Sequence, residues 1–215
     1  HLLMLINDIL DFSKMEAGKL DLEMIDFDLR AAVESVTELL AEQAQRKGLE
    51  LVSLVHASTP TAVQGDPGRL RQILMNLVGN AVKFTEQGRV VLQVRATENR
   101  GDSVTLLFEV TDPGIGIPLE KQGAIFDAFS QADGSTTRRF GGTGLGLSIA
   151  KRLVTLMSGT IGIESAIGQG AQFWFTVPLA VQSAPQRSGQ RPVAELHNRK
   201  VCIVDDDPAG RKVLE

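Results

Sequence analysis

The stretch "GGTGLGLS" at residues 141–148 is rich in glycine and leads directly into an amphipathic helical pattern. Backbone N–H groups at a helix N-terminus attract anions, and glycines allow the backbone to wrap closely around a phosphate. The stretch fits the phosphate-loop pattern G-x-x-x-x-G-K-[ST] at Gly141, Gly146 and Ser148, but Leu147 occupies the lysine position. These residues predict a phosphate-binding loop whose positive charge comes from another element.

Two other interpretations of this loop fit less well. The dinucleotide pattern G-x-G-x-x-G fails in both registers, because Leu147 and Ile149 occupy its last position and no buried strand precedes the loop. A plain flexible loop gives no reason for glycines to gather at the start of a helix, whereas an anion site does.

A second set of candidate residues lies on a helix that the sequence predicts from Asp66, a typical N-cap, and Pro67, which suits the first helical position. One face of this helix is apolar and contains Leu70, Ile73, Leu74, Leu77 and Ala81. The opposite face is a narrow polar stripe of Arg69, Gln72, Asn76, Asn80 and Lys83.

The two asparagines of this polar stripe are unusual, because asparagine is a poor helix former. An amide oxygen is a hard neutral ligand that suits Mg²⁺, an ion that takes few protein ligands alongside phosphates. Lys83 follows Asn80 by one turn and could supply the charge that Leu147 lacks. An ordinary solvated helix face is the alternative.

The stretch "VTDPGIGIP" at 110–118 places Asp112 at the end of a predicted strand, followed by Gly114 and Gly116. A carboxylate there can accept a hydrogen bond from the exocyclic amine of a base, and the glycines would let the ring approach. The alternative is a simple turn at the end of a strand, since aspartate, proline and glycine are common turn residues.

These residues must be positioned by a mixture of helices and strands. Helices are predicted after Asp28 and over 147–157, the second ended by Gly159. Alternating or apolar runs predict strands at 49–55, 90–96, 104–110, 160–165 and 171–179, with a hairpin turn at 98–102 and a loop at 58–65. We therefore expect residues 27–180 to form an α+β domain, a two-layer α/β sandwich.

Both ends of the chain differ from this domain. Residues 1–20 repeat apolar positions at helical spacing, as in a coiled-coil-like helix that stops near Gly18. Residues 181–198 have the composition of a linker, and residues 199–215 begin a new buried-strand pattern. We expect the chain to be a segment of a longer protein.

Composition limits the possible partners. The 215 residues carry a net charge of −4, which argues against nucleic-acid binding and gives no sign of attraction to an anionic membrane surface. The single cysteine, Cys202, excludes an internal disulfide and suits a reducing compartment. No apolar run approaches the roughly 18 residues of a membrane span, so we expect a cytoplasmic segment.

Four patterns in order identify a resemblance: N-x-x-x-N-A-x-K-F (76–84), D-x-G-I-G-I (112–117), "IFDAFSQAD" (125–133) and G-G-T-G-L-G-L (141–147). Together they resemble the ATP-binding domain of sensor histidine kinases, within the gyrase-type ATPase superfamily. Residues 1–20 look like the second helix of that family's dimerisation and phosphotransfer hairpin. Residues 199–215 look like the first strand and helix of a receiver domain, which is the order of a hybrid sensor kinase.

The resemblance implies roles for the residues that match its motifs. Asn80 would be the Mg²⁺ ligand, Asn76 would lie beside it on the phosphates of ATP, and Lys83 would meet the phosphate chain. Asp112 would bind the adenine amine. The remaining nucleotide contacts implied are Gly114 and Gly116 at the base, Phe126 and Phe129 as anchors of a lid, Arg138 and Arg139 within that lid, and Gly142, Thr143, Gly144, Leu145 and Gly146 at the phosphates. Asp205 and Asp206 match the receiver's acidic Mg²⁺ pair.

The sequence departs from the family pattern at two points. Pro113 stands where the family has a small polar residue, which removes one N–H donor. His1, His56 and His197 do not lie in the family's phospho-acceptor motif. The resemblance therefore implies that the acceptor histidine precedes this segment and that the receiver's acceptor aspartate follows it.

The function implied is transfer of the ATP γ-phosphoryl group to that upstream histidine and onward to a receiver aspartate. The implied partners are a second copy of the chain, paired through the hairpin helices, and a receiver or histidine-phosphotransfer protein. The whole protein is expected to be a membrane-anchored sensor with this part in the cytoplasm. Two alternatives stay open: an ATPase of the gyrase or mismatch-repair kind, and a non-catalytic nucleotide-sensing module.

Overall fold

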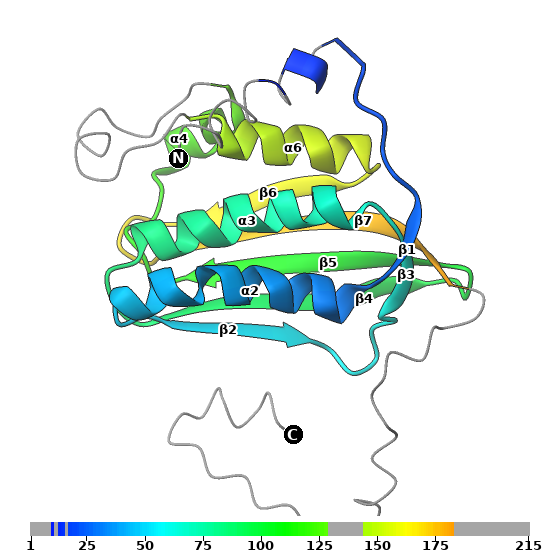
Figure 1. The fold of residues 1–215 in the computed structure, drawn as a ribbon. Coiled ribbons are helices and arrows are strands. Elements are labelled where there is room, and N and C mark those ends of the chain that lie inside the picture. The colour runs from blue at the N-terminus through cyan, green and yellow to red at the C-terminus, as the bar shows by residue number, and fades with distance from the viewer. Residues whose placement is uncertain (1–9, 11–12, 16, 129–143, 183–215) are drawn as a thin grey trace, which may run out of the picture. The chain divides into compact units, whose positions relative to one another are not determined.

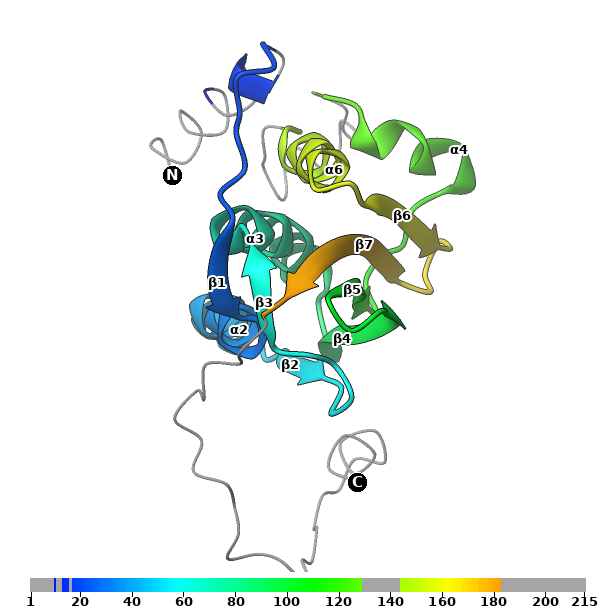
Figure 2. The same ribbon diagram turned by 90° about the vertical axis from the view of Figure 1, so that its right-hand side faces the viewer.

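The computed structural model describes residue 10, residues 13–15, residues 17–128 and residues 144–182. Within this part, a seven-stranded sheet carries three long helices on one of its faces (Figure 1). The view turned by 90° shows the helices as one layer and the curved sheet as the other (Figure 2). The expected two-layer α/β arrangement is therefore confirmed.

The sheet has the strand order β1-β3-β7-β5-β4-β2, with β6 paired to β7 beside that path. Only β2 and β4 pair in parallel among these described strands; the other pairs are antiparallel. The strands are β1 (Ile25–Asp28), β2 (Glu50–Val55), β3 (Ala62–Gly65), β4 (Arg89–Asn99), β5 (Ser103–Asp112), β6 (Thr160–Ser165) and β7 (Ala171–Val181). The long strand β7 pairs with β5 along one edge and with β6 and then β3 along the other.

The three long helices are α2 (Leu29–Arg46), α3 (Pro67–Phe84) and α6 (Gly146–Leu156). Asp28 and Asp66 cap the first two, because their carboxylates accept hydrogen bonds from the N–H groups of Ala31 and Arg69. Two short turns, α4 (Leu119–Gln122) and η1 (Ala124–Phe126), follow the β5 strand end. No helix of the described residues is long and apolar enough to cross a membrane.

The core lies between the helix layer and the sheet. Alternate residues of β4, β5 and β7 are buried, which is the period of two expected for a sheet with one covered face. The rings of Phe108 and Phe175 stack at its centre, with centroids 4.5 Å apart. Full burial of such side chains contributes about 1.5–3 kcal/mol each relative to exposure, so this layer supplies the rigid support for any site at its edge.

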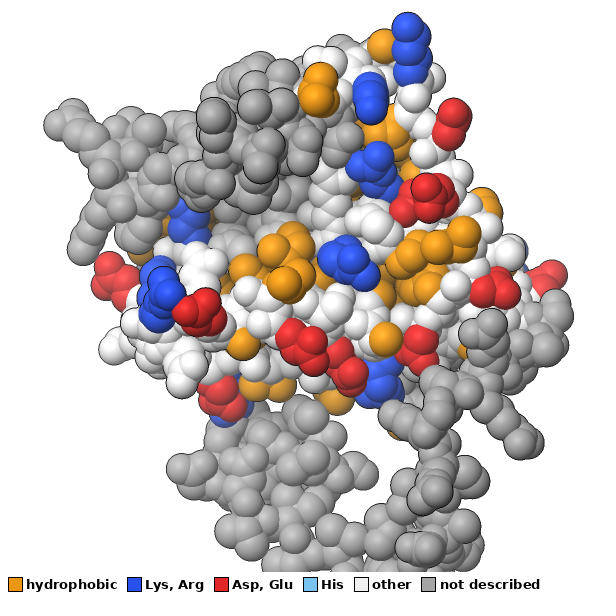
Figure 3. All heavy atoms as spheres, in the orientation of Figure 1, with side chains coloured by type: hydrophobic (Ala, Val, Ile, Leu, Met, Phe, Trp, Pro, Cys, Tyr) orange, Lys and Arg blue, Asp and Glu red, His pale blue; other side chains and the backbone are white. Residues whose placement is uncertain are grey.

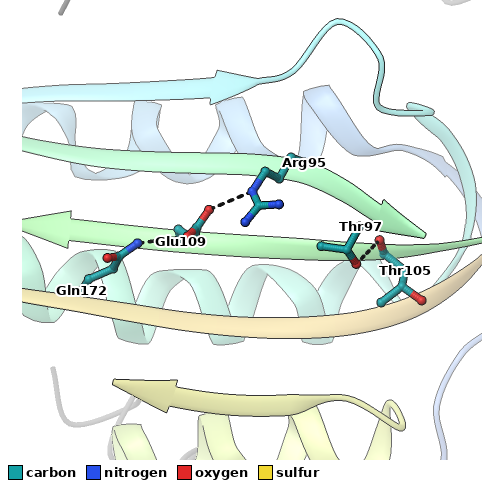
Figure 4. A network of polar contacts seen from close by, with 5 residues as sticks. All are labelled: Arg95, Thr97, Thr105, Glu109 and Gln172. Atoms are coloured by element: carbon teal, nitrogen blue, oxygen red, sulfur yellow. Dashed lines mark hydrogen bonds and ion pairs between the residues drawn. The ribbon is translucent and has the colours of Figure 1, made fainter. Parts of the chain in front are cut away.

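The opposite face of the sheet is polar (Figure 4). Glu109 accepts hydrogen bonds from Arg95 at 3.2 Å and from Gln172 at 3.0 Å, so the carboxylate joins β4, β5 and β7. The hydroxyl of Thr97 donates to the carbonyl of Thr105 at 3.2 Å.

In the orientation of Figure 1, the described surface mixes acidic, basic and apolar side chains (Figure 3).

The structure corrects the sequence analysis at three places. Residues 62–65 were expected to be loop but form β3, which pairs with an unpredicted strand, β1. The end of α6 was assigned to Gly159, but the residue with a positive φ is Ser158, at 60°. Gly159 is instead required by space, because a Cβ there would lie 1.8 Å from the carbonyl oxygen of Thr176.

The predicted end of the first helix near Gly18 is confirmed. Gly18 has a φ of 63°, and the N–H of Lys19 donates to the carbonyl of Lys14 across the helix end. Most of that helix lies outside the described residues, as do residues 183–198 of the predicted linker and the whole predicted receiver segment, with Asp205 and Asp206.

Candidate functional site

The polar stripe of α3 is half-buried along its whole length, so its side chains are partly shielded from solvent. Its members are Arg69, Gln72, Asn76, Asn80 and Lys83, all of intermediate exposure. Arg69 donates a hydrogen bond to the amide oxygen of Gln72 at 2.9 Å, so the first turn of the stripe is ordered by its own side chains. The asparagines and the lysine follow toward the C-terminal end of the helix.

Asn76 faces the N-terminal end of α6. Its amide nitrogen is buried and has no hydrogen-bond partner among the described residues. Its amide oxygen lies 3.0 Å from the point that a Cβ at Gly146 would occupy, so the glycine permits the close approach of the two helices. A buried donor without a partner costs about 1–3 kcal/mol, and a ligand that accepts a hydrogen bond here would remove that cost.

The start of α6 adds backbone donors beside this amide. Leu145 stands at the N-cap position and makes no capping hydrogen bond with its side chain, which is buried in the core. Gly144, immediately before it, has a φ of 72°, a conformation that glycine adopts without strain. The first N–H groups of a helix carry partial positive charge, so an anion near Asn76 would be stabilised here.

Lys83 lies two turns beyond Asn76 on the same stripe, with Asn80 between them. Burial lowers the pKa of the Lys83 ammonium from its ordinary value, because charge is disfavoured away from water. The ammonium also lies 4.8 Å from the centroid of the Phe84 ring, within the range of a cation–π contact. Lys83 therefore places on the half-buried face of α3 the cationic group that the glycine loop lacks at Leu147.

Asp112 is buried at the end of β5, near the C-terminal end of α3. The N–H of Gly114 donates to its carboxylate at 2.8 Å, and the hydroxyl of Thr85 lies 3.5 Å from the same oxygen. Burial raises the pKa of the Asp112 carboxyl above its ordinary value, although both of these donors act in the opposite direction. A buried carboxylate with one oxygen unused by these donors is suited to bind a donor group of a ligand.

Gly114 and Gly116 are both required by close packing. A Cβ on Gly114 would lie 2.6 Å from the Asp112 carboxylate and 2.8 Å from the carbonyl oxygen of Phe84. A Cβ on Gly116, where φ is 72°, would lie 1.9 Å from the carbonyl oxygen of Ala166. The first glycine therefore brings the loop onto the end of α3, and the second seats it on the turn between β6 and β7.

Two residues that the sequence analysis missed hold this loop in place. The hydroxyl of Ser165 accepts from the N–H of Ile117 at 2.8 Å and donates to the carbonyl of Gly170 at 2.6 Å. The amide of Gln122 donates to the carbonyls of Ile117 and Ser165, at 2.9 and 2.8 Å. Their partners are backbone atoms, which leave no residue pattern in the sequence.

Phe126 is buried at the end of η1, the second of the short turns that follow this loop. Its ring meets Phe173 edge-on, with centroids 6.4 Å apart, and the Lys151 ammonium of α6 lies 5.8 Å from its centroid. The residue thus fixes the chain to the sheet and to α6 immediately before residue 129. The other predicted contacts in this region lie outside the described residues: Phe129, Arg138, Arg139, Gly142 and Thr143.

A depression of about 300 Å³ is found where β5 and β6 end and β7 begins. It is lined by Thr111, Asp112, Glu164, Ser165, Ala166, Gln169, Gly170, Ala171 and Gln172. Asp112 of the candidate site lines it, together with Ser165 and Ala166, which hold the Asp112 loop, whereas no residue of the polar stripe does.

Comparison with known proteins connects this arrangement to one family. Residues 65–181 match the family described as histidine kinase-, DNA gyrase B-, and HSP90-like ATPase. The sensor histidine kinase GacS of Pseudomonas protegens is 45% identical over 214 residues, which are 100% of this chain and 23% of that protein. The signal transduction histidine-protein kinase BarA of Escherichia coli K12 is 49% identical over 179 residues, 83% of this chain and 20% of that protein.

A solved structure agrees with the sequence relatives. Full-length ShkA, in complex with AMPPNP, superposes with a TM-score of 0.74 at 41% identity, over 87% of this chain and 38% of that one. The chain spans less than a quarter of the length of GacS and BarA. The family match covers α3, the Asp112 loop and α6, which are the elements that bring the site residues together, and the chain belongs to the histidine kinase-, DNA gyrase B- and HSP90-like ATPase family.

Proposed function

We propose that this segment is the ATP-binding core of a hybrid sensor histidine kinase. The observation that carries the proposal is the amide of Asn76 against Gly146 at the start of α6, with its nitrogen buried and unpartnered among the described residues. Such an amide, beside the backbone N–H groups of the first turn of a helix, suits a phosphate group. The similarity to sensor histidine kinases supports the kinase over the other members of the family.

In this proposal the length of α3 sets the distance between the residues that would bind the two ends of the nucleotide. Asn76 and Thr85 are nine positions apart, so at a rise of 1.5 Å per residue they lie about 13 Å apart along the helix axis. Asp112, beside Thr85, would bind the exocyclic amine of adenine, and Gly114 and Gly116 would shape the surface under the ring. The phosphates would lie toward Asn76 and the start of α6, the long side chain of Lys83 would meet the phosphate chain, and Phe126 would be one anchor of the lid that the resemblance implies.

The residues present also fit a magnesium ion bound together with the phosphates. Asn80 would offer its amide oxygen, a ligand type that Mg²⁺ accepts alongside phosphate oxygens. When bound, the ion would neutralise phosphate charge. Lys83 would add a second positive charge from the same helix face, where burial strengthens its interaction with an anion.

Transfer of the γ-phosphoryl group would use a histidine in another part of the whole protein and continue to a receiver aspartate. Phosphoryl transfer depends mainly on positioning and on neutralisation of charge, which is what Asn76, Asn80, Lys83 and the start of α6 would supply. The partners in this proposal are a second copy of the protein and a receiver or histidine-phosphotransfer protein. The segment would act in the cytoplasm, joined to a membrane-anchored sensor.

The experiment that tests the proposal compares this segment with a version that is extended upstream. Calorimetry of the segment with AMPPNP should show binding that depends on Mg²⁺. Incubation with [γ-³²P]ATP should leave the segment unlabelled and should place acid-labile phosphate on the extended protein. Failure to bind AMPPNP, or stable labelling of His1, His56 or His197 in the segment, would contradict the proposal.

A further inference from the structure

The C-terminal end of α3 is held by a residue from a different helix. α3 ends without a glycine: Thr85, the residue after it, is extended with a φ of −95°, and its N–H bonds to the carbonyl of Ala81. Lys47, directly after α2, points its ammonium at this end. It donates to the carbonyls of Val82 at 2.8 Å, Lys83 at 2.6 Å and Thr85 at 3.1 Å.

This contact has an electrostatic advantage as well as a geometric one. The last carbonyls of a helix have no intrahelical donors and carry partial negative charge, so a lysine ammonium is stabilising there. A single nitrogen with three N–H groups satisfies three carbonyls at once. Lys47 is an exposed residue whose ammonium nevertheless contacts all three of these oxygens.

Phe84 and Thr85, which lie within the stretch that Lys47 contacts, border the candidate base site at Asp112 and Gly114. The carbonyl of Phe84, between two of the carbonyls bound by Lys47, is one of the two groups that leave no room for a side chain at 114; the other is the Asp112 carboxylate. The hydroxyl of Thr85 lies 3.5 Å from the Asp112 carboxylate, and Thr85 is fully buried. A shift of this short stretch would therefore move both groups that define the position of the Asp112 carboxylate and of Gly114.

We propose that Lys47 is a positioning residue for base recognition, acting through Phe84 and Thr85 on the Asp112 end of the site. The inference rests on the proposed function, because it assumes that this end binds adenine. The inference goes beyond the proposed function because it assigns part of the selectivity for adenine to Lys47, a residue outside the family motifs found in the sequence. Loss of the ammonium would release three carbonyls and the conformation that they hold.

The test is a comparison of nucleotide selectivity in Lys47→Met and in a matched control. Met keeps most of the apolar stem of Lys47 and removes the donors. The control is Arg46→Met at the preceding residue, whose exposed guanidinium pairs with the exposed Glu42 one turn earlier on α2. Affinities for Mg·AMPPNP and Mg·GMPPNP are measured by calorimetry, together with the melting temperature of each variant.

We expect Lys47→Met to weaken AMPPNP binding by roughly 3- to 20-fold and GMPPNP binding by less, so that the preference for adenine falls. Arg46→Met should leave both affinities within about twofold of the unmutated protein. Lys47→Arg should recover part of the preference, because it restores charged donors at a longer reach. Should Lys47→Met fail to fold, the same comparison is made on Lys47→Gln, which keeps a neutral donor.

Two results would overturn the inference, and they differ from failure of the proposed function. If both nucleotides weaken by the same factor in Lys47→Met or Lys47→Gln, Lys47 only stabilises the fold. If the adenine preference is unchanged while the melting temperature falls, the conclusion is the same. Absence of AMPPNP binding, or of adenine preference, in the unmutated protein would instead refute the nucleotide site itself and the inference with it.

Discussion

The amide oxygen of Asn76 lies 3.0 Å from the position that a Cβ on Gly146 would occupy, while its amide nitrogen is buried without a partner among the described residues. The amide oxygen of Asn76 thus lies close to Gly146, while its amide nitrogen remains an unused hydrogen-bond donor. A neighbour larger than glycine would crowd the amide, and a ligand would satisfy the donor. This relationship makes Gly146 as important to the site as the polar residue it faces.

Gly146→Ala should weaken nucleotide binding by roughly 3- to 10-fold without unfolding the protein. A Cβ at 3.0 Å from the Asn76 oxygen forces the amide to turn or the two helices to separate by a few tenths of an ångström. The measurement is the affinity for Mg·AMPPNP, with the melting temperature taken in parallel.

Gly79→Ala is the matched control for that variant, because Gly79 is also helical and a Cβ there meets nothing within 4 Å. Replacing an interior helical glycine by alanine should stabilise the fold by up to about 1 kcal/mol and leave affinity unchanged. Equal affinities in Gly146→Ala and Gly79→Ala would show that the Asn76 contact has no influence on the ligand.

Asn80→Ala should weaken Mg·ATP binding by about 1.5–3 kcal/mol, the range for loss of a contact to a charged group. The effect should shrink greatly when ATP is titrated with EDTA in place of magnesium, because the amide oxygen is assigned to the ion. Gln72→Ala, on the same half-buried stripe, serves as the control and should retain the magnesium dependence. If Asn80→Ala loses equal affinity with and without magnesium, Asn80 contacts the nucleotide directly or supports the fold.

Asp112→Asn should raise the melting temperature of the free protein at neutral pH while it reduces ATP affinity. Burial raises the pKa of Asp112, so the carboxyl contributes its full stability only below its unfolded value, near 3.8, and that contribution is lost as pH rises through the higher folded pKa. The neutral amide avoids the cost of burying a charge, but is a weaker acceptor for a base amine.

The melting temperatures of the unmutated protein and of Asp112→Asn, measured from pH 4 to pH 8, test the direction of this pH dependence. The advantage of Asp112→Asn should be largest at the upper end and should narrow toward pH 4, where the aspartate becomes protonated. An advantage that grows toward acid pH would mean that the carboxylate stabilises the fold, through the Gly114 N–H and the Thr85 hydroxyl, by more than its burial costs.

The parts of the fold that were predictable are those governed by short-range periodicity. The buried alternation of β5 and the caps at Asp28 and Asp66 are visible in the sequence because each depends on neighbours within a few residues. Strands β1 and β3 are only four residues long, so no alternation has room to develop. Their pairing, Ile25 with Gly65, joins distant segments.

The site shows the same division. The stripe on α3 and the Asp112 loop were predicted because their residue types are unusual for a helix face and recur in a known family pattern. Ser165, Gln122 and Lys47 could not be predicted, since each acts on backbone carbonyls or N–H groups that every residue has. The need for glycine at 116 is also tertiary, because the obstructing oxygen belongs to Ala166 on another element.

ATP turnover by the unmutated segment should be far slower than about 1 s⁻¹, an ordinary enzyme rate. Gyrase-type hydrolases resemble this chain in the same helix but have a glutamate, which activates water, where Asn76 stands. A neutral amide cannot accept a proton at neutral pH, so water has no general base at this position.

Asn76→Glu supplies that base and should raise phosphate release, by up to the 10²–10⁴-fold that a general base commonly contributes. The carboxylate would face Gly146 at the start of α6, where the helix end favours negative charge, so the substitution has electrostatic support. Asn76→Gln, of the same length but neutral, is the control and should stay as slow as the unmutated protein. The measurement is the rate of phosphate release under saturating Mg·ATP. A fast rate in the unmutated segment would show that the segment is a hydrolase. Equal rates in Asn76→Glu and Asn76→Gln would instead show that position 76 is not aligned with the attacking water.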